Sequence, residues 1–173
     1  MTKYILLILL FTVLNVYGYE YIFNDRCINE LYFIANTEFS RTDILVEKDS
    51  MGIILRFPIK NPAEECRELS TETVNNLKKI EQFLAKIENS VIIEVHTTDE
   101  DSVERNKLNN WEIAAVIAGK AEAEIRELSG GLGYDRISSV GYGEFSPVKN
   151  PPYNGGKYLN RIDIIVQCNI SGE

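Results

Sequence analysis

Residues 91–97 read Val-Ile-Ile-Glu-Val-His-Thr, and nearly all of them are apolar or β-branched. Such an almost unbroken run is typical of a strand inside a sheet, with a neighbouring strand on each side. A strand of this kind cannot fold alone, because other elements have to cover its apolar surface. The segments before and after residues 91–97 therefore determine the architecture.

Two amphipathic helices are predicted, one on each side of this strand. The first begins at Ser70 or Thr71, and its apolar residues recur at three- and four-residue spacing. The second opens at Asn109, where Glu112 three residues later completes a capping box. It ends at Ser129-Gly-Gly131. The apolar stripe of the second helix is predicted to comprise Trp111, Ala114, Ala115, Ala118, Ile125 and Leu128.

Three further strands are predicted at Ile53–Phe57, Ile137–Tyr142 and Leu159–Gln167. A long loop rich in Pro, Gly and Asn separates the last two of them. The chain order is thus strand, helix, strand, helix, strand, loop, strand. This order predicts an α/β (α+β) fold, a two-layer sandwich in which a mixed sheet carries both helices on one face.

The first fifty residues are predicted to form two separate parts. Residues 1–18 contain Lys3, an apolar run and the ending Val16-Tyr-Gly18, the pattern of a cleaved signal peptide. The apolar run is shorter than the ~20 residues that span a bilayer. Residues 19–50 are predicted as an extension with two strands, Leu31–Ala35 and Thr42–Val46, in a hairpin or short meander. The main domain then covers residues 51–173.

Composition and charge narrow the class of protein. Apolar residues make up 45% and charged residues 25% of the chain, as in ordinary globular proteins. The net charge of −8 disfavours nucleic acid and anionic lipid surfaces as partners. Three cysteines, Cys27, Cys66 and Cys168, allow at most one internal disulfide, and the sequence leaves its pairing open.

The sequence offers few residues that could form a catalytic or a metal site. The chain has a single histidine, His96, and no C-x-x-C motif or histidine cluster, so we expect neither a metal site nor a cofactor. His96 is expected to be a hydrogen-bonded structural residue, and Trp111 to pack in the core. Gly141 and Gly143 are expected to serve backbone geometry at a strand end. We expect the protein not to be an enzyme.

Four ordered stretches resemble the OmpA-like peptidoglycan-binding domain of Pal-type lipoproteins, OmpA-type porins and MotB-type flagellar stator proteins. They are Val95-His-Thr-Thr98, Asn110-Trp-Glu-Ile-Ala-Ala-Val-Ile-Ala118, Arg136-Ile-Ser-Ser-Val-Gly-Tyr-Gly-Glu-Phe-Ser-Pro147 and Gly156-Lys-Tyr-Leu-Asn-Arg-Ile-Asp-Ile164. The order and spacing of all four make the resemblance more specific than a single short motif. Function as a stator is not expected, because no predicted membrane span carries an acidic residue.

The resemblance implies recognition of diaminopimelate, or an equivalent diamino acid, in the peptide of the cell wall. In the family an Asp after His-Thr holds the amino group, and an Arg on the following helix pairs with the carboxylate. In this chain Thr98 stands at the Asp position with Asp99 next to it, and Ile117 stands at the Arg position. The predicted ligand-binding residues are Thr98, Asp99, Asn110, Ile117 and Arg161.

Two functions remain open at this stage. In the first, Asp99 replaces the missing Asp, and Arg161, Lys157 or Arg105 takes the carboxylate, so that the domain still binds peptidoglycan. In the second, the domain keeps the fold, has lost wall binding and acts as a protein-interaction or assembly module, with Val116 and Ile117 in a contact patch. Both place the protein in the periplasm, where it could be associated with the outer membrane and with other envelope proteins.

Overall fold

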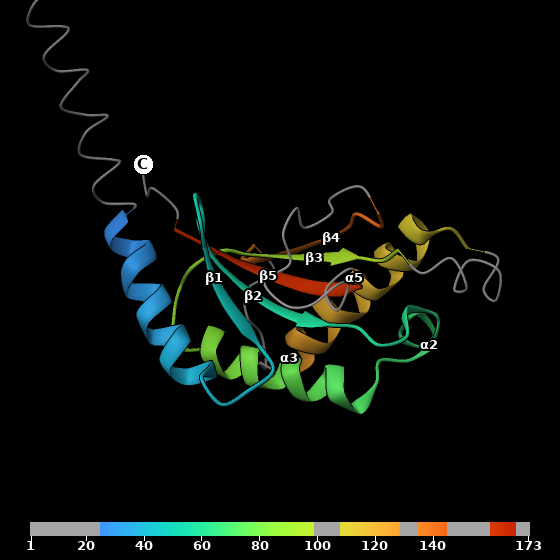
Figure 1. The fold of residues 1–173 in the computed structure, drawn as a ribbon, viewed down its shortest axis with the longest axis horizontal. Coiled ribbons are helices and arrows are strands. Elements are labelled where there is room, and N and C mark those ends of the chain that lie inside the picture. The colour runs from blue at the N-terminus through green and yellow to red at the C-terminus, as the bar shows by residue number, and fades with distance from the viewer. Residues whose placement is uncertain (1–24, 99–107, 129–134, 145–159, 169–173) are drawn as a thin grey trace, which may run out of the picture.

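A computed structural model describes residues 25–98, 108–128, 135–144 and 160–168. The described residues form a five-stranded sheet with helices packed against it (Figure 1). The strand order across the sheet is β1-β2-β5-β3-β4. The strands are β1 (Leu45–Asp49), β2 (Gly52–Pro58), β3 (Val91–His96), β4 (Ile137–Gly141) and β5 (Arg161–Gln167). The predicted signal peptide lies outside the described residues.

The sheet is mixed, which confirms the prediction. β1 pairs antiparallel with β2, β2 with β5, and β5 with β3, whereas β3 and β4 run parallel. A parallel pair needs a crossover connection, and helix α5 (Asn110–Leu128) lies between β3 and β4 in the chain. The predicted central strand, β3, has a neighbour on each side, β5 and β4.

The helices begin where polar caps predict them. α3 (Thr71–Leu84) follows Ser70, whose hydroxyl accepts a hydrogen bond from the Thr73 N–H at 3.2 Å. The capping box of α5 is present, because Asn109 N donates to Glu112 Oε2 at 2.8 Å and Glu112 N donates to Asn109 Oδ1 at 2.9 Å. A short helix, α2 (Pro62–Arg67), precedes α3. None of the helices in the described part of the chain has the length and apolar character needed to cross a membrane.

The core lies between the sheet and the helices. Alternate residues of the three middle strands are almost completely buried, as the two-residue period of a strand requires: Ile53, Leu55, Phe57, Val91, Ile93, Val95, Ile162, Ile164 and Val166. The predicted stripe of α5 is wrong in part, since Trp111 and Leu128 are exposed. The buried residues of α5 are Ile113, Ala114, Ile117, Ala118, Ala121 and Ile125.

The predicted strand Leu31–Ala35 is wrong. Residues 25–39 form one helix, drawn in blue in Figure 1. The physical reason is the spacing of its buried residues, which recur with the helical period rather than the strand period: Ile28, Leu31, Ala35 and Phe39. This helix packs on the common core, where the rings of Phe39 and Phe83 meet edge to face at 5.5 Å. The second predicted strand, Thr42–Val46, overlaps β1.

A disulfide ties the two ends of the described chain together. It joins Cys27, in the helix of residues 25–39, to Cys168, next to the end of β5. The two cysteines are 141 positions apart in sequence. Cys66 is a free, partly buried thiol. The helix therefore has both a covalent and an apolar attachment to the sheet.

Candidate ligand-binding site

Three segments converge beyond the end of β3. The backbone N–H of Thr97 donates to Gly143 O at 3.1 Å, and the Thr97 hydroxyl donates to Asn110 O at 2.8 Å. The next N–H, of Thr98, donates to Asn160 Oδ1 at 2.7 Å. These bonds connect the end of β3 to the start of α5, to the turn after β4 and to the residue before β5. Thr98 and Asn110, two of the predicted site residues, therefore lie at the same end of the sheet.

Two glycines let β4 and α5 approach each other at this place. A Cβ on Gly141 would lie 2.2 Å from the backbone nitrogen of Ala115. Gly143 has a positive φ of 54°, and a Cβ there would lie 2.8 Å from the backbone nitrogen of Trp111. The expected backbone role of both glycines is confirmed, because neither position has room for a side chain.

Asn110 has an unsatisfied polar atom. Its side-chain Oδ1 is buried and accepts no hydrogen bond. Buried polar atoms in proteins nearly always have a partner, so an orphaned acceptor is uncommon and calls for an explanation. At the first residue of α5, next to Thr97 and Thr98, it is chemically able to accept one hydrogen bond from a donor.

Arg161 is placed in an ion pair. Its side chain is almost fully buried at the first position of β5, and its Nε donates to Asp163 Oδ2 at 2.9 Å. Burial lowers the pKa of Arg161 from its ordinary value, although the negative charge of Asp163 acts in the opposite direction. The guanidinium therefore already has a carboxylate partner within the protein.

Ile117 lies in the core. Its side chain has no exposed surface and belongs to the buried stripe of α5. A contact patch made of Val116 and Ile117 side by side is therefore not formed, because successive helix residues point in different directions and only Val116 is exposed. The remaining predicted site residue, Asp99, lies outside the described residues, as do Arg105 and Lys157.

Trp111 is a surface residue rather than the predicted core residue. It is 55% exposed in the first turn of α5, while Ile113 and Ala114 take the inward positions. The sequence pattern was ambiguous here, because Trp111 and Ala114 are three residues apart and fit a helical stripe. An exposed tryptophan directly after Asn110 adds an aromatic surface to this end of the sheet.

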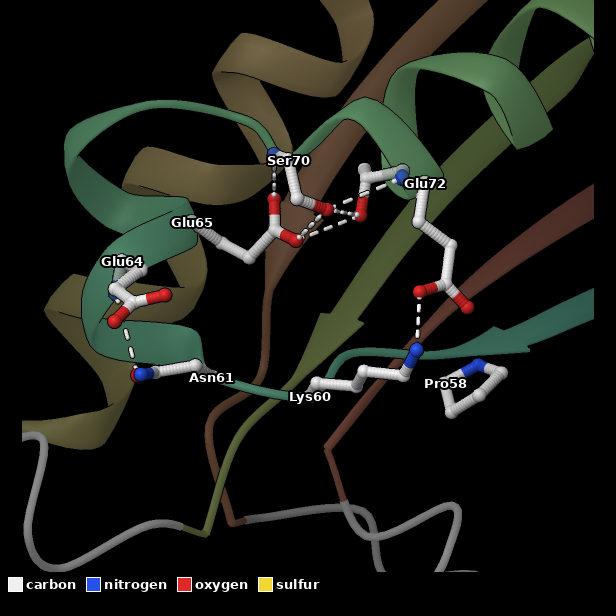
Figure 2. A pocket seen from close by; sticks show the side chains of 8 residues that line it. Pro58, Lys60, Asn61, Glu64, Glu65, Ser70 and Glu72 are labelled. Atoms are coloured by element: carbon white, nitrogen blue, oxygen red, sulfur yellow. Dashed lines mark hydrogen bonds and ion pairs between the residues drawn. The ribbon is translucent and has the colours of Figure 1, made fainter.

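A hollow of about 160 Å³ lies near the end of β2, between α2 and the start of α3 (Figure 2). Its buried acid, Glu65, accepts hydrogen bonds from Ser70 N at 2.9 Å, Ser70 Oγ at 2.6 Å and Thr73 Oγ1 at 2.8 Å. Lys60 pairs with Glu72 across it. These polar groups satisfy one another, so the hollow is explained by the capping of α3.

Solved structures with a similar fold include a periplasmic domain and a cell wall anchor of bacterial proteins. A putative MotB-like protein from Desulfovibrio vulgaris superposes with a TM-score of 0.65 at 20% identity, over 83% of this chain and 93% of that one. The cell wall anchor of the type VI secretion system (T6SS) from Pseudomonas aeruginosa gives 0.61 at 17% identity, over 80% and 95%. The periplasmic domain of Helicobacter pylori MotB gives 0.60 at 17% identity, over 73% and 80%.

The fold is thus the OmpA-like fold, as the sequence motifs predicted. The similarity is one of structure, since the sequence matches no protein-family model and no curated protein.

Proposed function

We propose that this is a periplasmic protein that binds peptidoglycan non-covalently, at the end of β3, through the diamino acid of the wall peptide. The observation that carries the proposal is the buried Asn110 Oδ1 without a hydrogen-bond partner. An ammonium group supplies the donor that this acceptor lacks, and a hydrogen bond to a charged group is worth about 1.5–3 kcal/mol. The fold shared with the cell wall anchor of Pseudomonas aeruginosa supports the same assignment.

The residues that we propose for binding the ammonium group of the ligand are already held in place by hydrogen bonds within the protein. Thr98 is held next to Asn110 by the hydrogen bond of its N–H to Asn160 and by the Thr97 hydroxyl on Asn110 O. Asp99 follows directly in sequence and adds the negative charge that an ammonium requires. We therefore assign the amino group of the ligand to Thr98, Asp99 and Asn110.

The carboxylate half has weaker contacts. Ile117 is buried and uncharged, so it offers no ionic partner. Arg161 would have to share its guanidinium between the ligand and Asp163, its present partner at 2.9 Å. Because a lost charged hydrogen bond costs about 1.5–3 kcal/mol, we expect binding to be about ten- to a hundredfold weaker than in a domain with an arginine on α5.

A second function is favoured by the same buried isoleucine. A domain with Ile117 in its core and Arg161 paired internally could have lost wall binding and kept the fold as an interaction module of the envelope. In that case the exposed Trp111 would contact a protein partner, since aromatic residues are enriched in interfaces. The two functions differ in one measurable property, which is retention on purified wall material.

A sedimentation assay with purified sacculi separates them. The protein from residue 19 onward is mixed with sacculi, and the bound fraction is measured with and without free diaminopimelate. Wall binding predicts co-sedimentation that the free amino acid reduces. Failure of the folded protein to sediment at any sacculus concentration would exclude wall binding and leave the interaction module.

Variants locate the site within the same assay. Asn110→Ala is expected to weaken retention by about tenfold, the equivalent of one charged hydrogen bond. Asn75→Ala is the matched control, since Asn75 is exposed on α3 and makes no contact at the end of β3. Equal retention of both variants would place the binding site elsewhere on the protein.

A further inference from the structure

His96, the single histidine of the chain, is buried without a hydrogen bond. It is 1% exposed, and both ring nitrogens, Nδ1 and Nε2, lack a hydrogen-bond partner. The ring is stacked on Tyr142, with the two centroids 5.4 Å apart and the planes 13° from parallel. The expectation of a hydrogen-bonded structural histidine is therefore wrong. An unsatisfied buried polar group destabilises the folded state, so the arrangement needs a compensating interaction.

Two carboxylates face one ring nitrogen of His96. Nε2 lies 3.6 Å from Glu94 Oε2 and 3.8 Å from Asp163 Oδ2. The register of the sheet explains the cluster, because Glu94 on β3 is directly opposite Asp163 on β5. His96 is two residues after Glu94 on the same strand, so all three side chains lie on the same face of the sheet. This face is opposite to the one that carries Val95 and the rest of the core.

The distances suit a shared ion better than direct hydrogen bonds. Separations of 3.6 and 3.8 Å are too long for a hydrogen bond. Two atoms that each lie about 2.0–2.2 Å from one metal ion are themselves roughly 3–4 Å apart. The ligand atoms of Glu94, His96 and Asp163 are all within 4.8 Å of one another. The Glu94 side chain is 20% exposed, against 4% for Asp163, so it has the freedom to close the remaining gap and provides the route from solvent.

Among the residues that the structure describes, the charges around the cluster leave an excess of one negative charge. Asp163 accepts hydrogen bonds from Arg56 Nε, Arg56 Nη2 and Arg161 Nε at 2.7, 3.0 and 2.9 Å. One of these bonds goes to Oδ1 and two go to Oδ2, so the acceptor position of the carboxylate that stays open for an ion is on Oδ1. Glu47 pairs with Arg56 at 2.6 Å. Within the described part of the chain, the carboxylates of Glu47, Glu94 and Asp163 therefore outnumber the guanidinium groups of Arg56 and Arg161 by one, which favours a cation in the cluster.

We propose that Glu94, His96 and Asp163 form a site for a divalent first-row transition metal ion, with Zn²⁺ as the best fit. One imidazole nitrogen and two carboxylate oxygens are a ligand set that Zn²⁺ accepts, whereas Ca²⁺ and Mg²⁺ prefer oxygen ligands alone. His96 Nε2 coordinates the ion and thereby gains the partner that it lacks. The ion lies between β3 and β5 and links the two central strands across their hydrogen-bonded pair.

Binding is tested with Zn²⁺ itself. The purified protein is freed of metal with a chelator and titrated with Zn²⁺ by calorimetry, and the thermal midpoint is measured with and without Zn²⁺. The site predicts one ion per chain and a midpoint that rises with Zn²⁺ concentration. Co²⁺ gives an independent readout, since its visible absorption reports nitrogen and oxygen coordination. Absence of a one-to-one isotherm in the folded protein would overturn the proposal.

Three variants assign the ligands. His96→Gln and Glu94→Gln each remove one ligand and are expected to lower the affinity for Zn²⁺ by more than about tenfold. Glu88→Gln is the matched control, because Glu88 is an exposed acid just before β3 and takes no part in the cluster. Circular dichroism shows whether each variant is folded. Zn²⁺ affinity that is unchanged in folded His96→Gln would show that any bound ion sits elsewhere.

Discussion

Arg56 and Asp163 lie directly opposite each other on β2 and β5 and form a buried, bidentate ion pair. Arg56 Nε is 2.7 Å from Asp163 Oδ1, and Arg56 Nη2 is 3.0 Å from Oδ2. Each side chain is only a few per cent exposed. A third contact, from Arg56 Nη1 to Glu47 at 2.6 Å, extends the pair to β1. Three neighbouring strands are therefore joined by charged groups on the face of the sheet opposite the core.

Removal of Arg56 should destabilise the protein strongly. Arg56→Met removes two of the hydrogen bonds that the buried carboxylate of Asp163 accepts and leaves the one from Arg161, and loss of one member of a buried pair typically costs about 3–5 kcal/mol. Urea unfolding followed by circular dichroism measures the loss. Arg26→Met is the control, since Arg26 forms a fully exposed pair with Glu30 and its replacement should leave the unfolding midpoint unchanged. Equal midpoints for the two variants would show that the buried pair contributes nothing.

Introduction of the family arginine at position 117 should damage the fold rather than create a binding site. Ile117 has no exposed surface, so Ile117→Arg buries an unpaired charge at a cost of about 3–5 kcal/mol. Val116→Arg adds the same charge one residue earlier at an exposed position and should change stability by less than about 0.5 kcal/mol. Unfolding in urea compares the two. A stable Ile117→Arg variant with stronger sacculus binding would show that this side chain reaches the surface.

The contact between β4 and α5 should tolerate no side chain at Gly141. Gly141→Ala places a Cβ 2.2 Å from the backbone nitrogen of Ala115, and the forced separation should cost about 1–3 kcal/mol or more. Gly119→Ala is the matched control, because Gly119 lies in the middle of α5 with no atom within 4 Å of the added Cβ. It should gain about 0.5–1 kcal/mol from higher helix propensity. Thermal midpoints that move in the same direction would contradict the packing.

The disulfide should contribute substantially to stability. Replacement of Cys27 and Cys168 by serine removes a cross-link between residues 141 positions apart and should lower the free energy of unfolding by about 2–5 kcal/mol. Reducing agent should lower the thermal midpoint of the original protein and leave that of the double variant unchanged. Cys66→Ser, at the free thiol, serves as the control and should keep the response to reducing agent.

The central part of the fold was predictable because its signals are local or strictly periodic. The apolar run of β3, the Ser70 cap of α3 and the Asn109–Glu112 capping box each depend on residues close together in the chain. Residues 25–39 were assigned wrongly because the five-residue window Leu31–Ala35 resembles a strand, and only the longer spacing from Ile28 to Phe39 shows the helix. The side of α5 that faces inward was also ambiguous, since Trp111 and Ile113 are both apolar and only packing decides between them.

The candidate site, too, could be predicted from the sequence only in part. Its location at the end of β3 and the residues Thr98 and Asn110 could be read from the motif order, and the structure brings these residues together through Thr97. The roles of Arg161 and His96 could not be read in this way. Arg161 pairs with Asp163 on its own strand, but the addition of Arg56 from β2 and of His96 from β3 to this buried group depends on sheet register, which one strand's sequence does not contain.

The class of fold follows from the sequence alone, because hydrophobic period, capping residues and glycine positions act over a few neighbouring residues. Which cysteines are bonded, which strands share charged groups and which polar atoms lack a partner depends on how the elements pack together. Such contacts can join residues more than a hundred positions apart, such as Arg56 and Asp163 or Cys27 and Cys168, and no local pattern in the sequence reports them. The same long-range register brings Asp163 to Glu94 and His96 and so creates the proposed metal site.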